Sequence, residues 1–395
     1  MAEELHVEGL SKVFPNGAVA LENVSFHAPE GTFVVLLGPS GSGKTTLVRI
    51  LAGIERVSKG SIRIGDGIVA DGRTHVPPER RRLSMVFQDY ALWPHLSALD
   101  NVTFALRRNA IGGTERRRRA AAMLERVGLG RLADRYPGEL SGGEQQRVAL
   151  ARALVGDTGL VLCDEPLSNL DADLRDRMRV EISALVREVG ATAVYITHDQ
   201  SEAFALADLV GVLEHGRLVQ MGAPEEVYSD PSTPFVARFT GISGELPVRL
   251  LAEVRADGMV EVEATSLTWS RPLLARGVDV RRTSKALLLI RPSAVRLCEA
   301  RGDGCHAVGT VADVAFRGRG YELAIDLLGG GRITNVTASG RVQRGKVVGL
   351  RFEETGCVVF GEADGCAVIQ EDTTATSAPQ YPFQPPLAPV TPTRA

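Results

Sequence analysis

The chain has 395 residues, of which 44% are hydrophobic and 24% are charged, and its formal net charge is -3. This length predicts about two to three domains with a sizeable buried core. The near balance of 45 Lys and Arg residues against 48 Asp and Glu residues excludes a general nucleic-acid binder, which needs a basic surplus. No apolar run is long enough for a transmembrane helix, and the acidic N-terminal stretch does not resemble a signal peptide.

The five cysteines are scattered and form neither a CxxC pair nor a Cys/His cluster with zinc spacing. An odd count at such positions is typical of a reducing compartment, so we expect no disulfide framework. Two runs of arginine, at residues 80–82 and 116–119, are expected to form a solvated loop and a solvated helix face.

The first strong motif follows an apolar run at residues 33–37, which predicts a buried parallel strand. Residues 38–45 match GxxxxGK[ST] and a helical pattern follows, so the order is strand, loop, helix. Backbone N–H groups of such a loop cradle phosphate oxygens, and the helix N-terminus adds partial positive charge. We expect Lys44 to contact the β- and γ-phosphates and the Thr45 hydroxyl to ligate Mg²⁺. The expected nucleotide cradle consists of Gly38, Pro39, Ser40, Gly41, Ser42, Gly43, Lys44, Thr45 and Thr46.

Two further apolar runs end in polar residues. Residues 160–163 are followed by Asp164 and Glu165, and residues 193–197 are followed by His198. Asp164 is a candidate Mg²⁺ ligand, because a carboxylate at the carboxyl end of a strand can reach the metal above a phosphate loop. Glu165 is a candidate general base that polarises the attacking water. His198 can donate to the γ-phosphate and reposition that water.

Three zones of the chain differ in composition and in their pattern of apolar runs. Residues 1–240 alternate strand-like and helical runs, which indicates α/β architecture. Residues 241–370 carry short β runs separated by glycine-containing turns, which predicts a small all-β domain of barrel-like or sandwich-like form. Residues 371–395 are rich in proline and poor in large apolar residues, which predicts a disordered, partly polyproline tail.

The order of these motifs resembles the ATP-binding cassette (ABC) ATPases. Residues 140–147, LSGGEQQR, resemble the signature motif of that family, and residues 168–171 resemble its D-loop. Gln88 resembles the Q-loop glutamine, His198 the switch histidine and Phe14 the aromatic residue that stacks on adenine. The resemblance covers about residues 1–240 and implies a P-loop NTPase domain with a RecA-like core and a helical subdomain. It also implies that Gln88 is a catalytic residue and a Mg²⁺ ligand, with ATP and Mg²⁺ as cofactors.

Residues 90–96, 197–203 and 231–236 narrow the resemblance to importers, whose separate ATPase chain carries a C-terminal OB-like (TOBE-type) regulatory domain. The sequence Ile-Arg-Pro at residues 290–292 resembles a recurrent element of that domain. The resemblance implies a homodimer in which ATP lies between the phosphate loop of one copy and Ser141, Gly142 and Gly143 of the other. It further implies integral membrane permease subunits, an indirect periplasmic or lipoprotein solute-binding protein, a peripheral place on the cytoplasmic face of the membrane, and no nucleic-acid partner.

The solute is left open. Residues 90–96 resemble the ferric-iron and polyamine members of the importer family more than the sugar members, so ferric iron or a polyamine is favoured and a sugar is the alternative. A soluble ABC ATPase without a permease is a further alternative, although the chain shows one cassette and no sustained heptad run. Trp93 is either a contact to the permease or a buried core aromatic. A kinase or GTPase is not favoured, because the chain has no NKxD motif.

Overall fold

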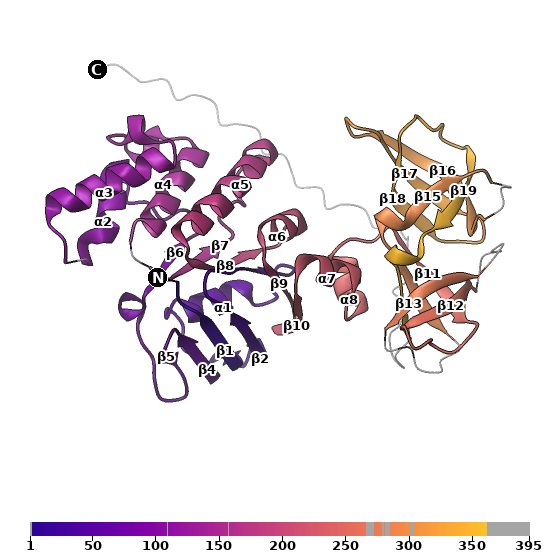
Figure 1. Ribbon diagram of the computed structural model, residues 1–395, viewed down its shortest axis with the longest axis horizontal. Helices are drawn as coiled ribbons and strands as arrows, with labels where there is room; N and C mark the ends of the chain where they lie inside the picture. Colours follow the sequence, from indigo (N-terminus) through magenta and orange to yellow (C-terminus); the bar gives the residue numbers. More distant parts are fainter. Residues whose placement is uncertain are drawn as a thin grey trace, which may run out of the picture. The chain divides into compact units, whose positions relative to one another are not determined.

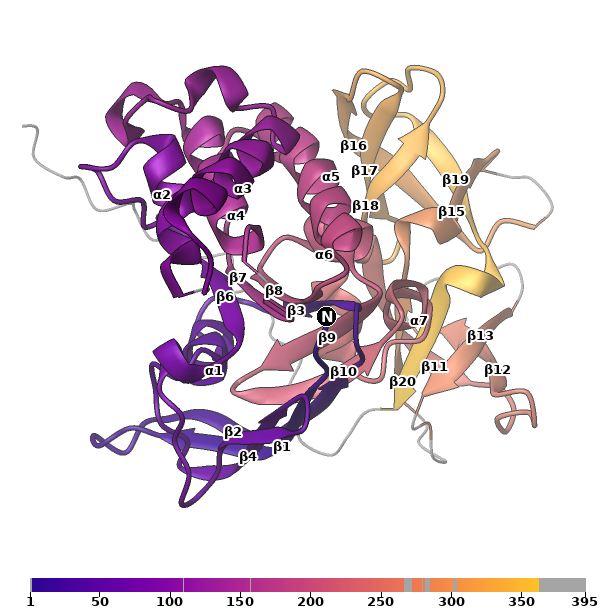
Figure 2. The same cartoon turned by 60° about the vertical axis from the view of Figure 1, so that its left-hand side comes forward.

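The computed structural model describes residues 2–108, 110–156, 158–265, 272–278, 280, 285–300 and 304–361 (Figures 1 and 2). The expected proline-rich tail at residues 371–395 lies outside the described residues, as does Cys366. None of the described helices combines the length and the apolar character that a membrane crossing needs.

A six-stranded sheet with the order β10-β9-β3-β8-β7-β6 is the core of the N-terminal part. Its strands are β3 (Phe33–Leu37), β6 (Leu83–Val86), β7 (Leu160–Asp164), β8 (Thr192–Thr197), β9 (Leu209–Glu214) and β10 (Arg217–Gly222). Neighbouring strands pair in parallel except at the β9–β10 edge. Every residue of β3, β7 and β8 is buried, which confirms the expectation that these three apolar runs are internal parallel strands.

Different layers cover the two faces of this sheet. Phe33, Val35 and Leu37 pack into one apolar cluster with the large helices, whereas Val34 and Leu36 pack into another with α1 and an antiparallel sheet. That second sheet has the order β2-β1-β4-β5. Its strands are β1 (Leu5–Val13), β2 (Val19–Ala28), β4 (Lys59–Ile64) and β5 (Gly67–Ala70).

The helices follow the expected α/β alternation. They are α1 (Lys44–Leu51), α2 (Ala98–Ala105), α3 (Gly113–Arg126), α4 (Gly142–Leu154), α5 (Ala172–Val189), α6 (Gln200–Leu206), α7 (Pro224–Ser229) and α8 (Pro234–Phe239). Short 3-10 turns are η1 (Pro78–Arg80), η2 (Leu106–Arg108), η3 (Gly130–Leu132), η4 (Pro137–Glu139), η5 (Pro292–Ala294) and η6 (Glu354–Gly356). Helices α2, α3 and α4 pack on one another and form a helical subdomain.

The arginine run at residues 80–82 is not a fully solvated loop, so that expectation is wrong for its middle residue. Arg81 is buried, and its guanidinium donates to the carbonyls of Val76 at 2.8 Å and Ile50 at 2.7 Å. It also donates to the carbonyl of Leu51 at 2.5 Å. The last carbonyls of a helix have no partner inside the helix, so a buried guanidinium with five donors can cap α1. Burial lowers the pKa of Arg81 to about 10.

The C-terminal part is all-β, as expected, and combines a barrel with a sheet. A closed barrel has the order β11-β12-β13-β20-β14, and a five-stranded sheet has the order β15-β19-β16-β17-β18. The barrel strands are β11 (Gly244–Leu250), β12 (Met259–Ala264), β13 (Leu273–Val278), β14 (Ala286–Ile290) and β20 (Cys357–Gly361). The sheet strands are β15 (Val295–Cys298), β16 (Ala307–Phe316), β17 (Tyr321–Leu327), β18 (Arg332–Ala338) and β19 (Val347–Phe352).

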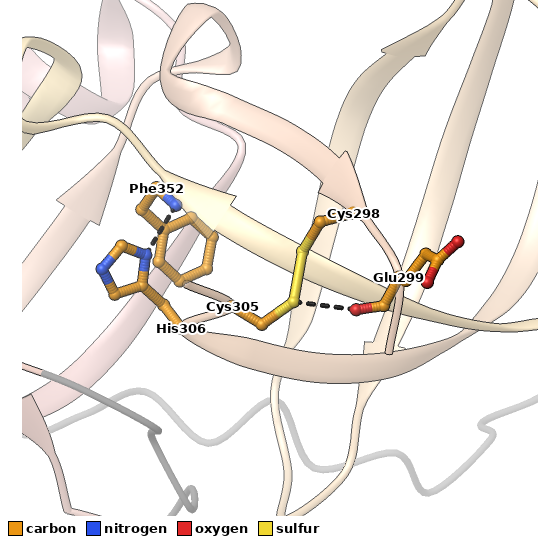
Figure 3. Close-up of a disulfide and its surroundings, with 5 residues drawn as sticks. All are labelled: Cys298, Glu299, Cys305, His306 and Phe352. Carbon is orange, nitrogen blue, oxygen red and sulfur yellow. Dashed lines mark hydrogen bonds between the residues drawn. A yellow bond between two sulfur atoms is a disulfide. The ribbon is translucent and has the colours of Figure 1, made fainter. Parts of the chain in front are cut away.

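One pair of cysteines departs from the expectation of no disulfide framework. Cys298, at the end of β15, and Cys305, just before β16, form a disulfide (Figure 3). Strands β15 and β16 both pair with β19, so a shared neighbour brings together two cysteines whose spacing alone gives no signal. Cys163 and Cys357 are buried free thiols, and burial raises the pKa of each to about 12.

Candidate active site

The loop between β3 and α1 folds around its own lysine. The Lys44 ammonium is buried and donates to the carbonyls of Gly38 at 2.8 Å and Pro39 at 2.9 Å. Burial lowers the pKa of Lys44, while the charges of Glu165 and Asp164 raise it. The lysine that the motif predicts for phosphate contact therefore lies inside the loop, with two carboxylates close enough to act on it.

The curvature of the loop depends on glycine at two positions. Gly43 has a φ of 98°, and a Cβ there would lie 2.5 Å from the Ala20 carbonyl oxygen. A Cβ on Gly38 would lie 2.5 Å from the Leu213 carbonyl oxygen and 2.7 Å from the Ser42 hydroxyl. These contacts leave no room for a side chain, so the loop backbone can approach its neighbours only because both residues are glycine.

The loop carries a hydroxyl donor that has no hydrogen-bond partner among the described residues. This donor is the buried Ser42 hydroxyl. Lys44 carries a full positive charge, and α1 begins at this residue with its free backbone N–H groups. An orphaned hydroxyl, a buried ammonium and a helix N-terminus together form a donor set that fits a phosphate. Ser40, Gly41, Thr45 and Thr46 complete the same segment, as expected.

The two acidic residues lie at the carboxyl end of β7, two strands from the phosphate loop. Asp164 pairs in register with Ile196 of β8, and Thr197 of β8 pairs with Leu37 at the end of β3. Asp164 is buried, and the Thr45 side chain lies near enough to lower its pKa against the stronger effect of burial. Burial and the neighbouring charge of Glu165 raise the pKa of Asp164. Thr45 and Asp164 thus offer two oxygen ligands at one point, which suits Mg²⁺.

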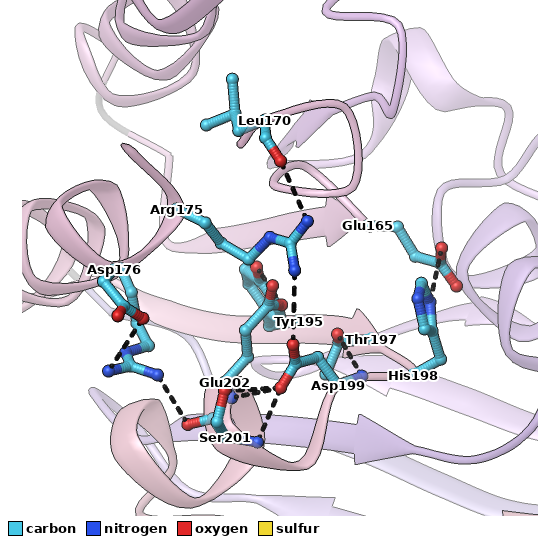
Figure 4. A network of polar contacts seen from close by, with 11 residues as sticks. Glu165, Leu170, Arg175, Asp176, Tyr195, Thr197, His198, Asp199, Ser201 and Glu202 are labelled. Atoms are coloured by element: carbon cyan, nitrogen blue, oxygen red, sulfur yellow. Dashed lines mark hydrogen bonds and ion pairs between the residues drawn. The ribbon is translucent and has the colours of Figure 1, made fainter. Parts of the chain in front are cut away.

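Glu165 and His198 meet across neighbouring strand ends (Figure 4). The Glu165 carboxylate oxygen Oε2 lies 3.1 Å from His198 Nδ1. Glu165 has a φ of 44°, a left-handed conformation that costs a non-glycine residue about 1–3 kcal/mol. Its backbone N–H donates to the Ile196 carbonyl at 3.1 Å, which helps to hold that conformation. The structure therefore brings together the candidate base and the candidate switch histidine, as the motifs predict.

A polar network that includes Arg175 and Asp199 lies near this pair, and no sequence motif predicts it (Figure 4). Arg175 of α5 donates to the Leu170 carbonyl at 2.9 Å and lies 3.6 Å from an Asp199 carboxylate oxygen. Asp199 caps α6 and directly follows His198, so Arg175 links the segment after Glu165 to the segment after His198. In the sequence, Arg175 is recognisable only as a residue four positions after Asp171, the N-terminal cap of α5. That spacing does not predict its contacts, because they depend on how α5 packs beside the segment after His198.

A buried acid lies under the same segment. The Tyr195 hydroxyl donates to the Glu202 carboxylate at 2.8 Å, and both groups are buried. Burial raises the pKa of Glu202, and burial together with the charge of Glu202 raises that of Tyr195 well above its usual value. This bond ties β8 to the first turn of α6 on the side away from solvent.

Gln88 follows β6, whose end pairs with the end of β7. The Gln88 carbonyl accepts a hydrogen bond from the Asn169 side chain at 3.0 Å. Two residues further on, the Tyr90 carbonyl accepts from the Arg152 guanidinium of α4 at 2.7 Å. The segment after β6 is therefore connected both to the segment after Glu165 and to the helical subdomain.

The residues expected from the signature motif and the expected adenine-stacking residue lie apart from this group among the described residues. Ser141 caps α4 in a reciprocal capping box with Glu144, and α4 packs on α2, α3, α5 and β6. Helix α4 begins at Gly142, so Gly142 and Gly143 are its first residues. Phe14 lies in the turn between β1 and β2, with the Lys12 ammonium 5.0 Å from the centre of its ring.

Comparison with known proteins identifies the family. Residues 21–168 match the ABC transporter family, and residues 288–360 match the TOBE domain family. The chain is 44% identical over 319 residues to a Fe(3+) ions import ATP-binding protein FbpC of Brucella suis, with 81% of this chain and 86% of the relative covered. The chain belongs to the ATP-binding proteins of importer-type ABC transporters.

Other relatives of this ABC ATPase carry different solutes in their names. It is 41% identical to a spermidine/putrescine import ATP-binding protein PotA of Frankia alni, with 84% of this chain and 73% of the relative covered. It is 46% identical to an sn-glycerol-3-phosphate import ATP-binding protein UgpC of Jannaschia sp., with 65% and 72% covered. A solved dimeric ATP-binding cassette bound to ADP and Pi, in a post-hydrolysis state, is 33% identical with a TM-score of 0.50. The aligned region spans 56% of this chain and 98% of the solved cassette.

The ABC ATPase also has a large groove between its parallel sheet and its helical subdomain. The groove has a volume of about 1190 Å³ and is lined in part by Leu83, Phe87, Leu92, Trp93, Phe104 and Arg152. Trp93 is 45% exposed, so the alternative that it is a buried core aromatic is wrong. Buried Asn101 holds the backbone of Trp93 through hydrogen bonds of 2.9 Å and 3.1 Å, which leaves the indole ring facing the groove.

Proposed function

We propose that this chain hydrolyses ATP with Glu165 as the general base. The observation that carries the proposal is the meeting of the phosphate loop, the acid pair and His198 at one edge of the parallel sheet. Lys44 binds the β- and γ-phosphates, and Glu165 takes the proton from the attacking water. His198, held by Glu165, donates to the γ-phosphate and keeps that water in line. Gln88 contacts the same water and metal, and Phe14 stacks on the adenine.

We infer that Mg²⁺ is held by Thr45, Asp164 and Gln88. Thr45 lies in the first turn of α1, Asp164 ends β7 and Gln88 follows β6. All three offer oxygen ligands, which Mg²⁺ prefers. The metal neutralises charge on the phosphates when it is bound. The ionised form of Asp164 is the ligand, and the positive charges of Lys44 and Arg49 favour that form against burial.

We propose further that the second half of each ATP site comes from another copy of the chain. Ser141, Gly142 and Gly143 form a helix N-terminus, and their helix packs within the helical subdomain rather than on α1. Such a terminus favours an anion, and the γ-phosphate bound to a partner's loop supplies one. The dimeric form of the related cassette supports this arrangement. ATP then joins the two copies, and hydrolysis releases them.

The transport partner is proposed to be an integral membrane permease that inserts a helix into the groove at Trp93. The groove is apolar and lies next to the segment after Gln88, so closure around ATP would move it. This places the protein peripherally on the cytoplasmic face of the membrane, with a solute-binding protein acting indirectly on the far side and no nucleic-acid partner. We assign residues 1–240 to the ATPase, residues 241–370 to the TOBE-type regulatory domain and residues 371–395 to a tail.

For the solute we favour ferric iron or a polyamine. The names of relatives that align over four fifths of this chain support these two, whereas the sn-glycerol-3-phosphate relative aligns over a shorter part. The test is to purify Glu165→Gln from native membranes in ATP and identify the permease that accompanies it. The wild-type complex in vesicles is then assayed for ATP hydrolysis with its binding protein loaded with Fe³⁺, spermidine, a sugar or sn-glycerol-3-phosphate.

The expected result is stimulation by Fe³⁺ or spermidine and none in a matched Lys44→Ala complex. Stimulation by the sugar or by sn-glycerol-3-phosphate alone would contradict the solute assignment. Recovery of Glu165→Gln with ribosomes or repair factors and without any membrane protein would contradict the transport role.

A further inference from the structure

The solvent face of the antiparallel sheet carries a cluster of two histidines and one glutamate that ATP hydrolysis does not use. His6 of β1 pairs in register with His27 of β2, so their side chains lie side by side on one face. Glu4 precedes His6 by two residues and therefore lies on the same face. One possible ligand atom from each residue falls within 4.8 Å of the other two.

The distances within this cluster match those of a coordination sphere. Glu4 Oε2 lies 3.1 Å from His6 Nε2 and 3.4 Å from His27 Nε2. Ligand bonds of about 2.1 Å separate neighbouring ligand atoms by about 3.4 Å in a tetrahedral site and by about 3.0 Å in an octahedral one. The two imidazole rings stack with their centres 4.0 Å apart, which presents both Nε2 atoms to the same carboxylate oxygen. Little movement is needed to place a cation among the three atoms.

We propose that Glu4, His6 and His27 bind a divalent first-row transition metal, with Zn²⁺ as the best match, and that the metal joins β1 to β2. Two imidazoles and one carboxylate are a common protein ligand set for Zn²⁺, with water completing the coordination. The side chains are between 24% and 45% exposed, so a hydrated ion can reach them from solvent. Mg²⁺ and Ca²⁺ prefer all-oxygen sites and are not expected to bind here.

Two charged residues beside the cluster set its affinity. Arg63 of β4 pairs with His6 on the other side of β1, and Glu8 lies two residues after His6. Both line the same shallow pocket as His6. The guanidinium of Arg63 repels a cation and the carboxylate of Glu8 attracts one. Arg63→Gln should therefore tighten the site although it leaves all three ligands in place.

The test is calorimetric titration of the metal-free full chain with Zn²⁺, repeated with His27→Gln, Glu4→Gln and Arg63→Gln. The control is His95→Gln, which removes an exposed histidine outside the cluster. We expect loss of one binding event, or at least about tenfold weaker affinity, in His27→Gln and Glu4→Gln, since even second-shell changes cost about that much. His95→Gln should bind Zn²⁺ as the wild type does, and Arg63→Gln should bind several-fold more tightly.

Titration with Co²⁺ gives an independent readout, because its visible absorption reports coordination. The absorption of the cluster should disappear in His27→Gln while the metal-free melting temperature stays unchanged. Identical Zn²⁺ stoichiometry and affinity in wild type, His27→Gln and Glu4→Gln would overturn the proposal and leave the cluster as an ion-pair group.

Discussion

Gly43→Ala tests whether the phosphate loop tolerates any side chain at its tightest point. The φ of 98° costs an alanine about 1–3 kcal/mol relative to glycine. The new Cβ would also meet the Ala20 carbonyl oxygen at 2.5 Å and Leu21 Cδ2 at 2.8 Å. The Ala20 atom belongs to the backbone of β2 and cannot rotate away, so overpacking adds about 1–3 kcal/mol. The total is about 2–6 kcal/mol, divided between lower stability and a displaced loop.

The assay measures both parts of this cost. Urea unfolding gives the change in folding free energy, and titration with ATP gives the change in affinity. If the whole free-energy change appears as displacement of the loop and none as lower folding stability, the affinity for ATP falls by about 30-fold to about 10⁴-fold, at 1.4 kcal/mol per tenfold change. Gly112→Ala is the control, since Gly112 has a φ of -65° and nothing lies within 4 Å of the added Cβ. A combined loss below about 1 kcal/mol in Gly43→Ala would refute the reasoning.

Three further substitutions examine the rest of the site. Arg175→Gln should lower kcat for ATP hydrolysis more than it changes KM, because the segments that position Glu165 and His198 lose their link. The conservative variant Arg175→Lys should restore part of the rate. Equal effects of Arg175→Gln on kcat and KM in steady-state assays would argue against a positioning role. Ser141→Arg should leave ATP binding intact but abolish hydrolysis, because the partner's γ-phosphate loses its helix N-terminus; unchanged hydrolysis would count against the two-copy site. Burial raises the pKa of Glu202, so the folded state binds its proton more tightly than the unfolded chain does and this group's contribution to stability falls as the pH rises. The melting temperature of Glu202→Gln should therefore improve relative to wild type as the pH rises above the ordinary glutamate pKa of 4.5, and a change in the opposite direction would contradict this sign.

Local motifs predict which side chains meet at one edge of the parallel sheet. The phosphate loop, Asp164, Glu165 and His198 each follow an apolar run, and a buried parallel strand is what such a run forms. Once those runs are strands of one sheet, their carboxyl ends must share an edge, so the meeting of these residues follows from the sequence. The all-β character of the C-terminal part was predictable for the same reason, since short apolar runs between glycine turns leave few other options.

Features that depend on register or on distant packing were not predictable. His6 and His27 face each other because β1 and β2 pair in one register, and the disulfide of Cys298 with Cys305 depends on a shared neighbour strand. Arg81 looks like part of a solvated run, but the end of α1 needs a buried donor at that point. His27 and the end of α1 are remote in sequence from the residues that contact them. The two cysteines are only seven residues apart, but their pairing depends on the strands that flank β19, so composition and spacing carry no signal for any of these contacts.

The measurement that tests the central claim most directly compares ATP binding and ATP turnover in Glu165→Gln and wild type. Glutamine has the shape of glutamate and leaves Lys44 and its loop in place, so the affinity for ATP should stay within a few-fold. Turnover should fall by about 10²-fold to 10⁴-fold, which is the contribution of a general base. Lys44→Ala should instead lose ATP binding together with activity. Near-normal turnover by Glu165→Gln with normal ATP binding would contradict the account.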